Sequence, residues 1–272
     1  MRLIKKASGE KEPFNIKKFK RSLLRSGASE KTIERLIDEV EKRKDLETTF
    51  DIYRYALDYL VSQRSHATGR YNLKKALFKL GPSGFPFEKF LAKIFEQQGY
   101  SVSLNQIISG KCATYEIDLL LKKDEMHHFV ESKFHGKQGR KADIQVTLYS
   151  KARFDDIEAH YTQKPYNEKK ELEAWVITNT RFTSKAIRYA NCVGLKVVDW
   201  SYPSDGSLAV LIDTLGVHPV TALTSLSSKQ ARSLIEKGLV LCREVKQHVN
   251  ILKEIGLDQR QISRVVKEAE ET

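Results

Sequence analysis

The chain has 272 residues, of which 40% are hydrophobic and 30% charged, a balance that excludes a disordered protein and favours two or three globular domains. No apolar run is long enough to cross a bilayer and the first residues lack a signal-peptide core, so we expect a cytoplasmic protein without membrane contact. Residues 1–80 hold 20 Lys or Arg and 11 Asp or Glu, which is +9 of the total net charge of +12, and this excess favours a polyanion partner, either nucleic acid or nucleotide phosphate.

Residues 1–82 are predicted to form a mostly helical domain. A short strand-like start precedes two segments with apolar residues at helical spacing, around residues 19–24 and 33–40. A further helix is predicted to open near Thr49 and to continue through Tyr53. The turn-rich segment 81–86 marks the end of this domain.

Residues 86–202 alternate between helical and strand-like patterns. The spacing of apolar residues predicts helices over 87–98, 142–154 and 184–192. Between them, β-rich runs predict strands over 100–104, 116–121, 128–133, 174–178 and 196–200. Strands that alternate with helices predict an α/β domain.

Residues 217–272 have a wholly helical pattern, with Ser228 and Asp258 as predicted helix caps. The segment contains no acid–base or metal-ligand cluster, so its role stays open between a dimer contact, a DNA contact and a packing cap. Together the three segments predict an α+β multidomain protein.

Three polar residues of the middle domain form a candidate catalytic set. Asp118 lies in an apolar strand-like run, where an unpaired carboxylate is costly to bury. Glu131 and Lys133 are two residues apart on the next run and therefore share a face of a strand. If the two runs form a hairpin, the set suits Mg²⁺-dependent phosphodiester hydrolysis. On these three residues alone, a solvated Glu–Lys surface pair is the simpler interpretation.

Four segments, in this order, resemble the Mrr-like branch of the PD-(D/E)xK restriction endonuclease superfamily: Phe87-Glu88-Lys89-Phe90, Glu116-Ile117-Asp118-Leu119, Val130-Glu131-Ser132-Lys133, and the strand–helix–strand pattern of residues 175–195. The resemblance implies a restriction-endonuclease-like α/β core with a central mixed sheet. It implies that Asp118 and Glu131 bind Mg²⁺ or Mn²⁺ and that Lys133 assists the nucleophile. It also makes Glu88 an auxiliary acid and Gln145 a supporting polar residue.

Residues 4–18 resemble the opening of an ATP-cone domain, a small, mostly helical regulatory module. This resemblance implies ATP or dATP as a regulatory ligand, or a cone fold kept only as a structural or oligomerising module. There is no Gly-rich phosphate loop with Gly-Lys-Ser/Thr, so no ATP-hydrolysing motor is expected. The family's nucleotide-binding positions correspond to Lys6, Glu12, Asn15, Lys18, Thr49, Tyr53 and Lys74.

The sequence therefore predicts a metal-dependent endodeoxyribonuclease of the Mrr-like, type IV kind, regulated by ATP or dATP. It would act on double-stranded DNA as a homodimer or higher homo-oligomer, since a twofold protein matches the symmetry of a duplex. One alternative is a non-catalytic, nucleotide-responsive DNA-binding regulator. ATP-cone regulators commonly carry a four-cysteine zinc ribbon, which Cys112, Cys192 and Cys242 cannot supply. The other alternative is a repair or junction-resolving nuclease.

Overall fold

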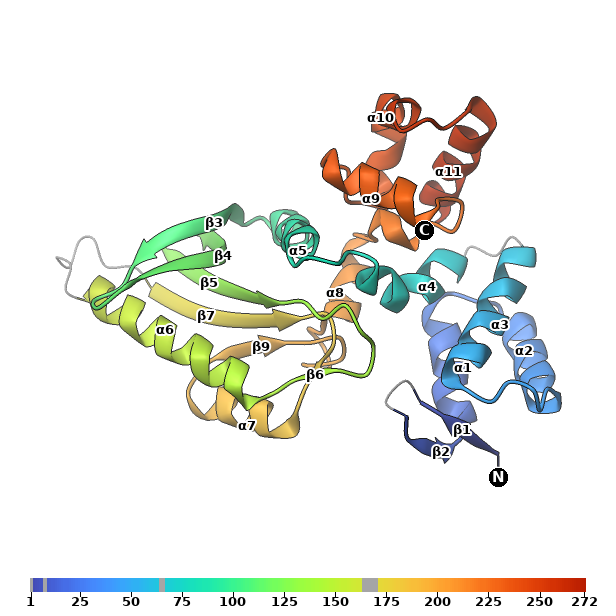
Figure 1. Ribbon diagram of the computed structural model, residues 1–272, viewed down its shortest axis with the longest axis horizontal. Helices are drawn as coiled ribbons and strands as arrows, with labels where there is room; N and C mark the ends of the chain where they lie inside the picture. Colours follow the sequence, from blue (N-terminus) through green and yellow to red (C-terminus); the bar gives the residue numbers. More distant parts are fainter. Residues whose placement is uncertain (1, 7–8, 64–66, 163–170) are drawn as a thin grey trace. The chain divides into compact units, whose positions relative to one another are not determined.

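The computed structural model describes residues 2–6, 9–63, 67–162 and 171–272, so Ala7 and Ser8 of the cone-like segment lie outside the described residues. The chain divides into two compact units (Figure 1). Unit 1 comprises residues 1–79, 137–139 and 218–272, and unit 2 comprises residues 80–136 and 140–217. Segments from both ends of the chain thus build unit 1. No helix in the described part of the chain is both long and apolar enough to cross a membrane.

The N-terminal part of unit 1 is a two-stranded hairpin followed by four helices. Strands β1 (Leu3–Lys5) and β2 (Lys11–Pro13) pair antiparallel, with Gly9 between them in the left-handed region at φ 89°. The helices are α1 (Ile16–Arg25), α2 (Glu30–Lys42), α3 (Thr49–Ser62) and α4 (Ala67–Phe78). Their apolar faces share one core with Ile4 of the hairpin, and the half-buried Phe14 packs against that core. The members of this core include Phe19, Leu23, Ile33, Leu36, Ile52 and Leu60.

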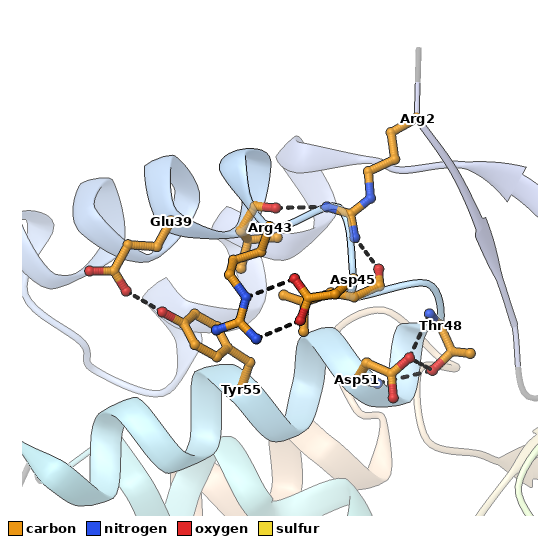
Figure 2. Close-up of polar contacts among 9 residues, drawn as sticks. Arg2, Glu39, Arg43, Asp45, Thr48, Asp51 and Tyr55 are labelled. Carbon is orange, nitrogen blue, oxygen red and sulfur yellow. Dashed lines mark hydrogen bonds and ion pairs between the residues drawn. The ribbon is translucent and has the colours of Figure 1, made fainter.

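A polar network fixes the loop between α2 and α3 (Figure 2). Arg43 donates two hydrogen bonds to the Asp45 carboxylate, and Arg2 donates to the backbone carbonyls of Val40 and Leu46. At the start of α3, the Thr48 hydroxyl accepts from the Asp51 backbone, and the Asp51 carboxylate accepts from the Thr48 backbone. This reciprocal capping box begins the helix that was predicted near Thr49.

The C-terminal part of unit 1 is helical, as predicted. It contains two 3₁₀ segments, η2 (Val220–Ala222) and η3 (Cys242–His248). Its α-helices are α9 (Ser228–Glu236), α10 (Val249–Glu254) and α11 (Gln259–Glu271). Asp258 caps α11 as expected, whereas α9 is capped by Ser227 and not by Ser228, since the Ser227 hydroxyl accepts from the Gln230 backbone.

Direct contacts join this C-terminal part to α4. The Asn72 side chain donates to the carbonyl of Ala222 at 3.0 Å, and the Thr221 hydroxyl donates to the carbonyl of Ala76 at 2.8 Å. Both hydrogen bonds are buried, and the two partners of each bond are 150 and 145 positions apart in the sequence. The helices at the two ends of the chain therefore pack as parts of one unit.

Unit 2 is built on a five-stranded mixed sheet of order β3-β4-β5-β7-β9. The strands are β3 (Ser101–Ser109), β4 (Thr114–Lys123), β5 (Met126–Lys133), β7 (Glu171–Thr178) and β9 (Lys196–Val198). The first three form an antiparallel meander, and β7 and β9 continue the sheet in parallel with β5. A separate parallel pair joins β6 (Lys141–Ala142) to β8 (Arg181–Phe182).

Helices cover both faces of this sheet. On one face, Phe95 of α5 (Phe85–Gln97) packs edge-on against Trp175 of β7. On the other, Phe154 of α6 (Ile144–Thr162) packs against Phe129 of β5. Helix α7 (Ser184–Cys192) contacts α6, and α8 (Leu208–Leu215) contacts α5 (Figure 1). The predicted central mixed sheet is confirmed, and α7 has the predicted bounds.

Candidate active site

The β4–β5 hairpin brings the candidate catalytic residues onto adjacent strands. Leu119 and Val130 are the last registered pair, so Asp118 and Glu131 follow next on the two strands. The backbone N–H of Ser132 donates to Asp118 Oδ2 at 2.6 Å, which ties the Asp118 carboxylate to the strand that carries Glu131. The hairpin that the sequence made conditional is therefore present.

The end of β5 is held in place from β7. The Thr178 hydroxyl donates to the carbonyl of Lys133 at 2.7 Å. The buried Asn179 side chain bonds both the N–H and the carbonyl of His135, at 2.8 and 2.9 Å. These contacts fix the backbone on which the exposed Lys133 ammonium is carried. From this strand end the charge of Lys133 acts on Glu131, whose pKa it lowers.

Glu88 of α5 approaches the same carboxylates. Its Oε2 accepts from Asn105 Nδ2 at 3.4 Å, and the same amide donates to Glu116 at 3.3 Å. Asn105 adopts a left-handed backbone at φ 49°, which directs its side chain between these acids. Burial, and next the negative charge of Asp118, raise the pKa of Glu88. The auxiliary acid expected on the opening helix thus belongs to the same electrostatic cluster.

The site holds its carboxylates at an electrostatic cost. Burial raises the pKa of Asp118, and the hydrogen bonds from Ser132 offset only part of that effect. Burial, and next the charge of Asp118, raise the pKa of Glu131 to about 7, although Arg153 and Lys133 act in the opposite direction. Burial is the largest cause in each case, and the charge of Asp118 adds to it at Glu88 and Glu131. A divalent cation bound by these carboxylates would favour their ionised forms.

Arg153 of α6 is a site residue that the sequence analysis missed. Its guanidinium donates to Glu131 Oε2 at 2.6 Å and to the carbonyl of Glu116. It lies over the rings of Tyr115 and Tyr149, at 5.5 and 5.4 Å from their centroids. Arg153 therefore orients Glu131 and shields its charge.

Gln145 is placed differently from the other expected residues. It lies in the first turn of α6 and is exposed, two helical turns before Arg153. Its side chain makes no hydrogen bond with any residue that the structure describes. Gln145, Tyr149 and Arg153 follow at intervals of four, which places them along one face of the helix. The spacing relates Arg153 to Gln145 along the helix, but it does not predict the contact of Arg153 with Glu131.

The donor set fits a magnesium ion that keeps water and binds phosphate. No group of three or more His, Cys, Asp or Glu side chains within the described ranges is arranged to hold a metal ion. Mg²⁺ in phosphoryl chemistry is commonly held by one or two carboxylates, with waters and phosphate oxygens completing the shell. Asp118 and Glu131 can supply that pair, and the ion would oppose the burial and the charge of Asp118 that raise the pKa of Glu131.

The seven expected nucleotide residues lie on the hairpin and helices of unit 1. Lys6 pairs with Glu12 at 2.5 Å, and Asn15 caps α1 by accepting from the backbone of Lys18. Thr49 begins α3, and Lys74 lies on α4. Tyr53 donates to Asn72 at 2.5 Å and stacks on Tyr71 with ring centroids 5.5 Å apart. Lys6, Glu12, Asn15 and Lys18 thus gather where the hairpin meets α1.

A mixed sheet with a helix on each face, and with acidic residues and a lysine on its central hairpin, defines unit 2 as a restriction-endonuclease-like fold. Residues 82–201 match the restriction endonuclease family Mrr_cat, which confirms the predicted Mrr-like core. Residues 218–272 match the family described as AF1548-like, C-terminal.

The chain belongs to the family of an Archaeoglobus fulgidus protein that is named only as an uncharacterized protein. The two are 33% identical over 180 residues, which cover 66% of this chain and 97% of the relative. A crystal structure titled as a protein of unknown function, AF1548, is 31% identical with a TM-score of 0.57, and it covers 69% of this chain and 97% of its own. The Mrr-like match supports a nuclease core over residues 82–201, and the ATP-cone resemblance of residues 1–82 stays a prediction.

Proposed function

We propose that the protein is a Mg²⁺-dependent endonuclease that hydrolyses phosphodiester bonds of double-stranded DNA. One observation carries this proposal. Asp118 and Glu131 are partly buried acids with raised pKa values, and Lys133, at the end of the same hairpin, acts on Glu131 by its positive charge. Buried acids that repel one another are destabilising unless a cation is part of their function.

Each residue has a distinct role in this proposal. Asp118 and Glu131 hold the metal, which when bound lowers the pKa of a water ligand and neutralises charge on the phosphate. Lys133 orients the attacking water and stabilises negative charge that develops on the phosphate oxygens. Arg153 keeps the Glu131 carboxylate in position through its hydrogen bond. Glu88 has a raised pKa and assists as an auxiliary acid.

The proposal includes regulation by ATP or dATP through the hairpin and helices of unit 1. It is supported by the grouping of Lys6, Glu12, Asn15 and Lys18 near the start of α1. Glu12 forms an ion pair with Lys6 at 2.5 Å, so a triphosphate would compete with Glu12 for that ammonium. Glu12→Gln is therefore expected to strengthen nucleotide binding and Lys6→Ala to weaken it.

The test is cleavage of supercoiled plasmid by the purified full chain in Mg²⁺ or Mn²⁺, with and without ATP or dATP. Asp118→Ala and Lys133→Ala are each expected to lower the rate by at least about 100-fold, as expected for the loss of a metal ligand or of a group that stabilises the transition state. Glu158→Gln on the exposed side of α6 serves as the matched control and keeps the wild-type rate. Wild-type activity in either site variant would refute the site.

The same experiment separates the alternatives. ATP-dependent DNA binding without cleavage in any divalent metal would favour the non-catalytic regulator. Selective cleavage of branched over plain duplexes would favour a repair or junction-resolving enzyme. If both strands are cut in one encounter, the active species is expected to be a homodimer, which sedimentation on DNA would show.

A further inference from the structure

Helix α1 carries a row of basic side chains that the proposed nuclease site does not use. Lys17, Lys20, Arg21 and Arg25 are all exposed, and we call these four residues the α1 basic face. At 100° per residue they lie together on the side of the helix opposite Phe19 and Leu23, which are buried in the core of unit 1. The four charges thus share one side of the helix, with the exposed Leu24 among them.

The charge of this face is not neutralised by any acidic side chain in the described part of the chain. The segment Ile16–Arg25 contains no acidic residue. None of the four side chains forms an ion pair with a residue in the described ranges, whereas Arg35, Lys42 and Arg43 of the neighbouring segment each pair with an acid. Four like charges on successive turns repel one another, so the face is favourable only toward an anion supplied by a partner.

A second feature of unit 1 repeats this excess of positive charge. Lys5 and Lys11 are directly opposite each other across the β1–β2 hairpin, and both are exposed. Like charges in directly opposed positions destabilise a hairpin. Their occurrence in the same unit is consistent with binding of a polyanion.

The spacing of the face fits a nucleic-acid backbone better than a single nucleotide. From Lys17 to Arg25 the helix rises about 12 Å, while duplex DNA presents a negative charge about every 1.7 Å along its axis. The phosphates of one nucleotide form a single compact cluster that cannot reach side chains on three turns. Lys18 is not counted in the face, because the nucleotide proposal already includes it.

Two other partners fit the helix less well. A membrane-surface helix needs an apolar face to insert between lipids, and the apolar face of α1 is used by the protein core. The exposed apolar residues Ile16 and Leu24 are only two and stand among charges. A protein partner typically finds aromatic anchors at an interface, and the exposed side of α1 has none.

We propose that the α1 basic face is a second DNA-contact surface, which binds the phosphate backbone of duplex DNA independently of sequence. The choice of DNA as the polyanion rests on the proposed nuclease function. The face lies in unit 1, so the nuclease unit alone does not account for the affinity of the full chain for DNA.

The test is fluorescence anisotropy of a labelled 30-base-pair duplex with the full chain in EDTA, repeated from 50 to 300 mM KCl. Replacing Lys17, Lys20, Arg21 and Arg25 together with glutamine is expected to weaken binding at least about tenfold. The replacement is also expected to reduce the magnitude of the slope of log affinity against log salt by about 0.9 for each lost phosphate contact, or about 3.6 for all four. Glutamine is a good helix former, so α1 is retained, which circular dichroism checks.

A matched variant separates the face from net charge. Lys31, Lys229, Arg232 and Arg260 are also two lysines and two arginines, exposed and in unit 1, and their replacement with glutamine removes the same charge. This control is expected to keep a slope within about 1 of the wild type. Lys17→Arg, Lys20→Arg, Arg21→Lys and Arg25→Lys together keep the charge and are expected to keep the slope.

Three results would overturn the inference. The first is an equal loss of DNA affinity in the face variant and the matched control. The second is a face variant that keeps DNA binding but loses ATP binding, and the third is a face variant that loses affinity for anionic phosphatidylserine vesicles but not for DNA. None of these results bears on whether the wild type cuts plasmid in Mg²⁺, so the proposed DNA-contact surface and the proposed nuclease activity can be refuted independently.

Discussion

Glu131 is the residue whose environment sets the pH dependence of the metal-free protein. Its side chain is 25% exposed and its carboxyl pairs with Arg153, yet the pKa of that carboxyl is raised to about 7. In the unfolded chain a glutamate titrates near 4.3. The folded state therefore takes up a proton at a higher pH than the unfolded state, which is the opposite of the usual behaviour of a salt-bridged acid.

We predict that unit 2 of the metal-free protein loses stability as the pH rises from about 5 to 8. A group with a raised folded pKa contributes stability that is complete below its unfolded pKa and is lost as the pH rises through about 7. The loss due to Glu131 is on the order of 3 kcal/mol, and Glu131→Gln is expected to flatten the profile by that amount. The measurement is urea unfolding followed by fluorescence, since Trp175 and Trp200 both lie in unit 2.

The control for this profile is Glu158→Gln, a change to an exposed acid of α6, which is expected to leave the curve unchanged. A Glu131→Gln profile that parallels the wild type would show that Glu131 titrates at its ordinary pKa. Saturating Mg²⁺ is expected to remove the decline above pH 7 in the wild type only, because a bound cation stabilises the ionised carboxylates.

The sequence predicted part of this site for a simple reason. Residues two apart on a strand share a face, so Glu131 and Lys133 could be grouped, and the apolar neighbours of Asp118 marked it as unusual. Arg153 could not be grouped with them, because its contact with Glu131 spans 22 residues and depends on how α6 packs on the sheet. The local sequence predicts that Arg153 lies on a helix, but it does not predict where α6 crosses β5.

At the scale of elements, the start of α3 depends on a local capping box. Thr48→Ala removes the hydroxyl that accepts from Asp51 N–H and is expected to destabilise unit 1 by about 1 kcal/mol. Thr49→Ala, one residue later, removes no cap and is the matched control. The measurement is hydrogen exchange of the α3 amides, where only Thr48→Ala raises the rates. Equal effects of the two changes would contradict the capping role.

Helices α6 and α7 and strand β3 show where the prediction of element bounds succeeds and where it does not. Helix α7 was predicted with its observed bounds, and the structure shows that Thr183 caps its start and that Gly194 follows its end. Strand β3 was predicted to end at residue 104 but continues to Ser109, since pairing with β4 carries the polar residues Asn105 and Gln106 into the sheet. Helix α6 runs eight residues past its predicted end at Phe154. Pairing and packing across the fold override a weak local pattern in each case.

At the scale of the molecule, the sequence predicted three consecutive segments, while the contacts define two units. The hydrogen bonds Asn72–Ala222 and Ala76–Thr221 join residues about 150 positions apart. No local sequence pattern predicts a contact between residues so far apart.

We predict that residues 1–79 and 218–272 fold together when residues 80–217 are replaced by a flexible linker of about six residues. Thr221 contacts Ala76 directly, so the two cut ends lie within a few residues of a hydrogen-bonded pair. Calorimetry is expected to show one cooperative transition for the linked protein, and a lower midpoint for residues 1–79 alone. Equal midpoints would mean that the C-terminal helices are an independent domain.

The closeness of residues 76 and 221 has a further effect on the nuclease unit. While unit 1 stays folded, it holds the two ends of the intervening segment together, much as a covalent cross-link would. An unfolded nuclease in the intact chain is then a closed loop with fewer conformations than a free chain. Chain-entropy arguments put the resulting stabilisation at up to about 4 to 5 kcal/mol. The excised nuclease is therefore expected to melt at a lower temperature than the same residues in the full chain, with every side-chain contact of its own unchanged.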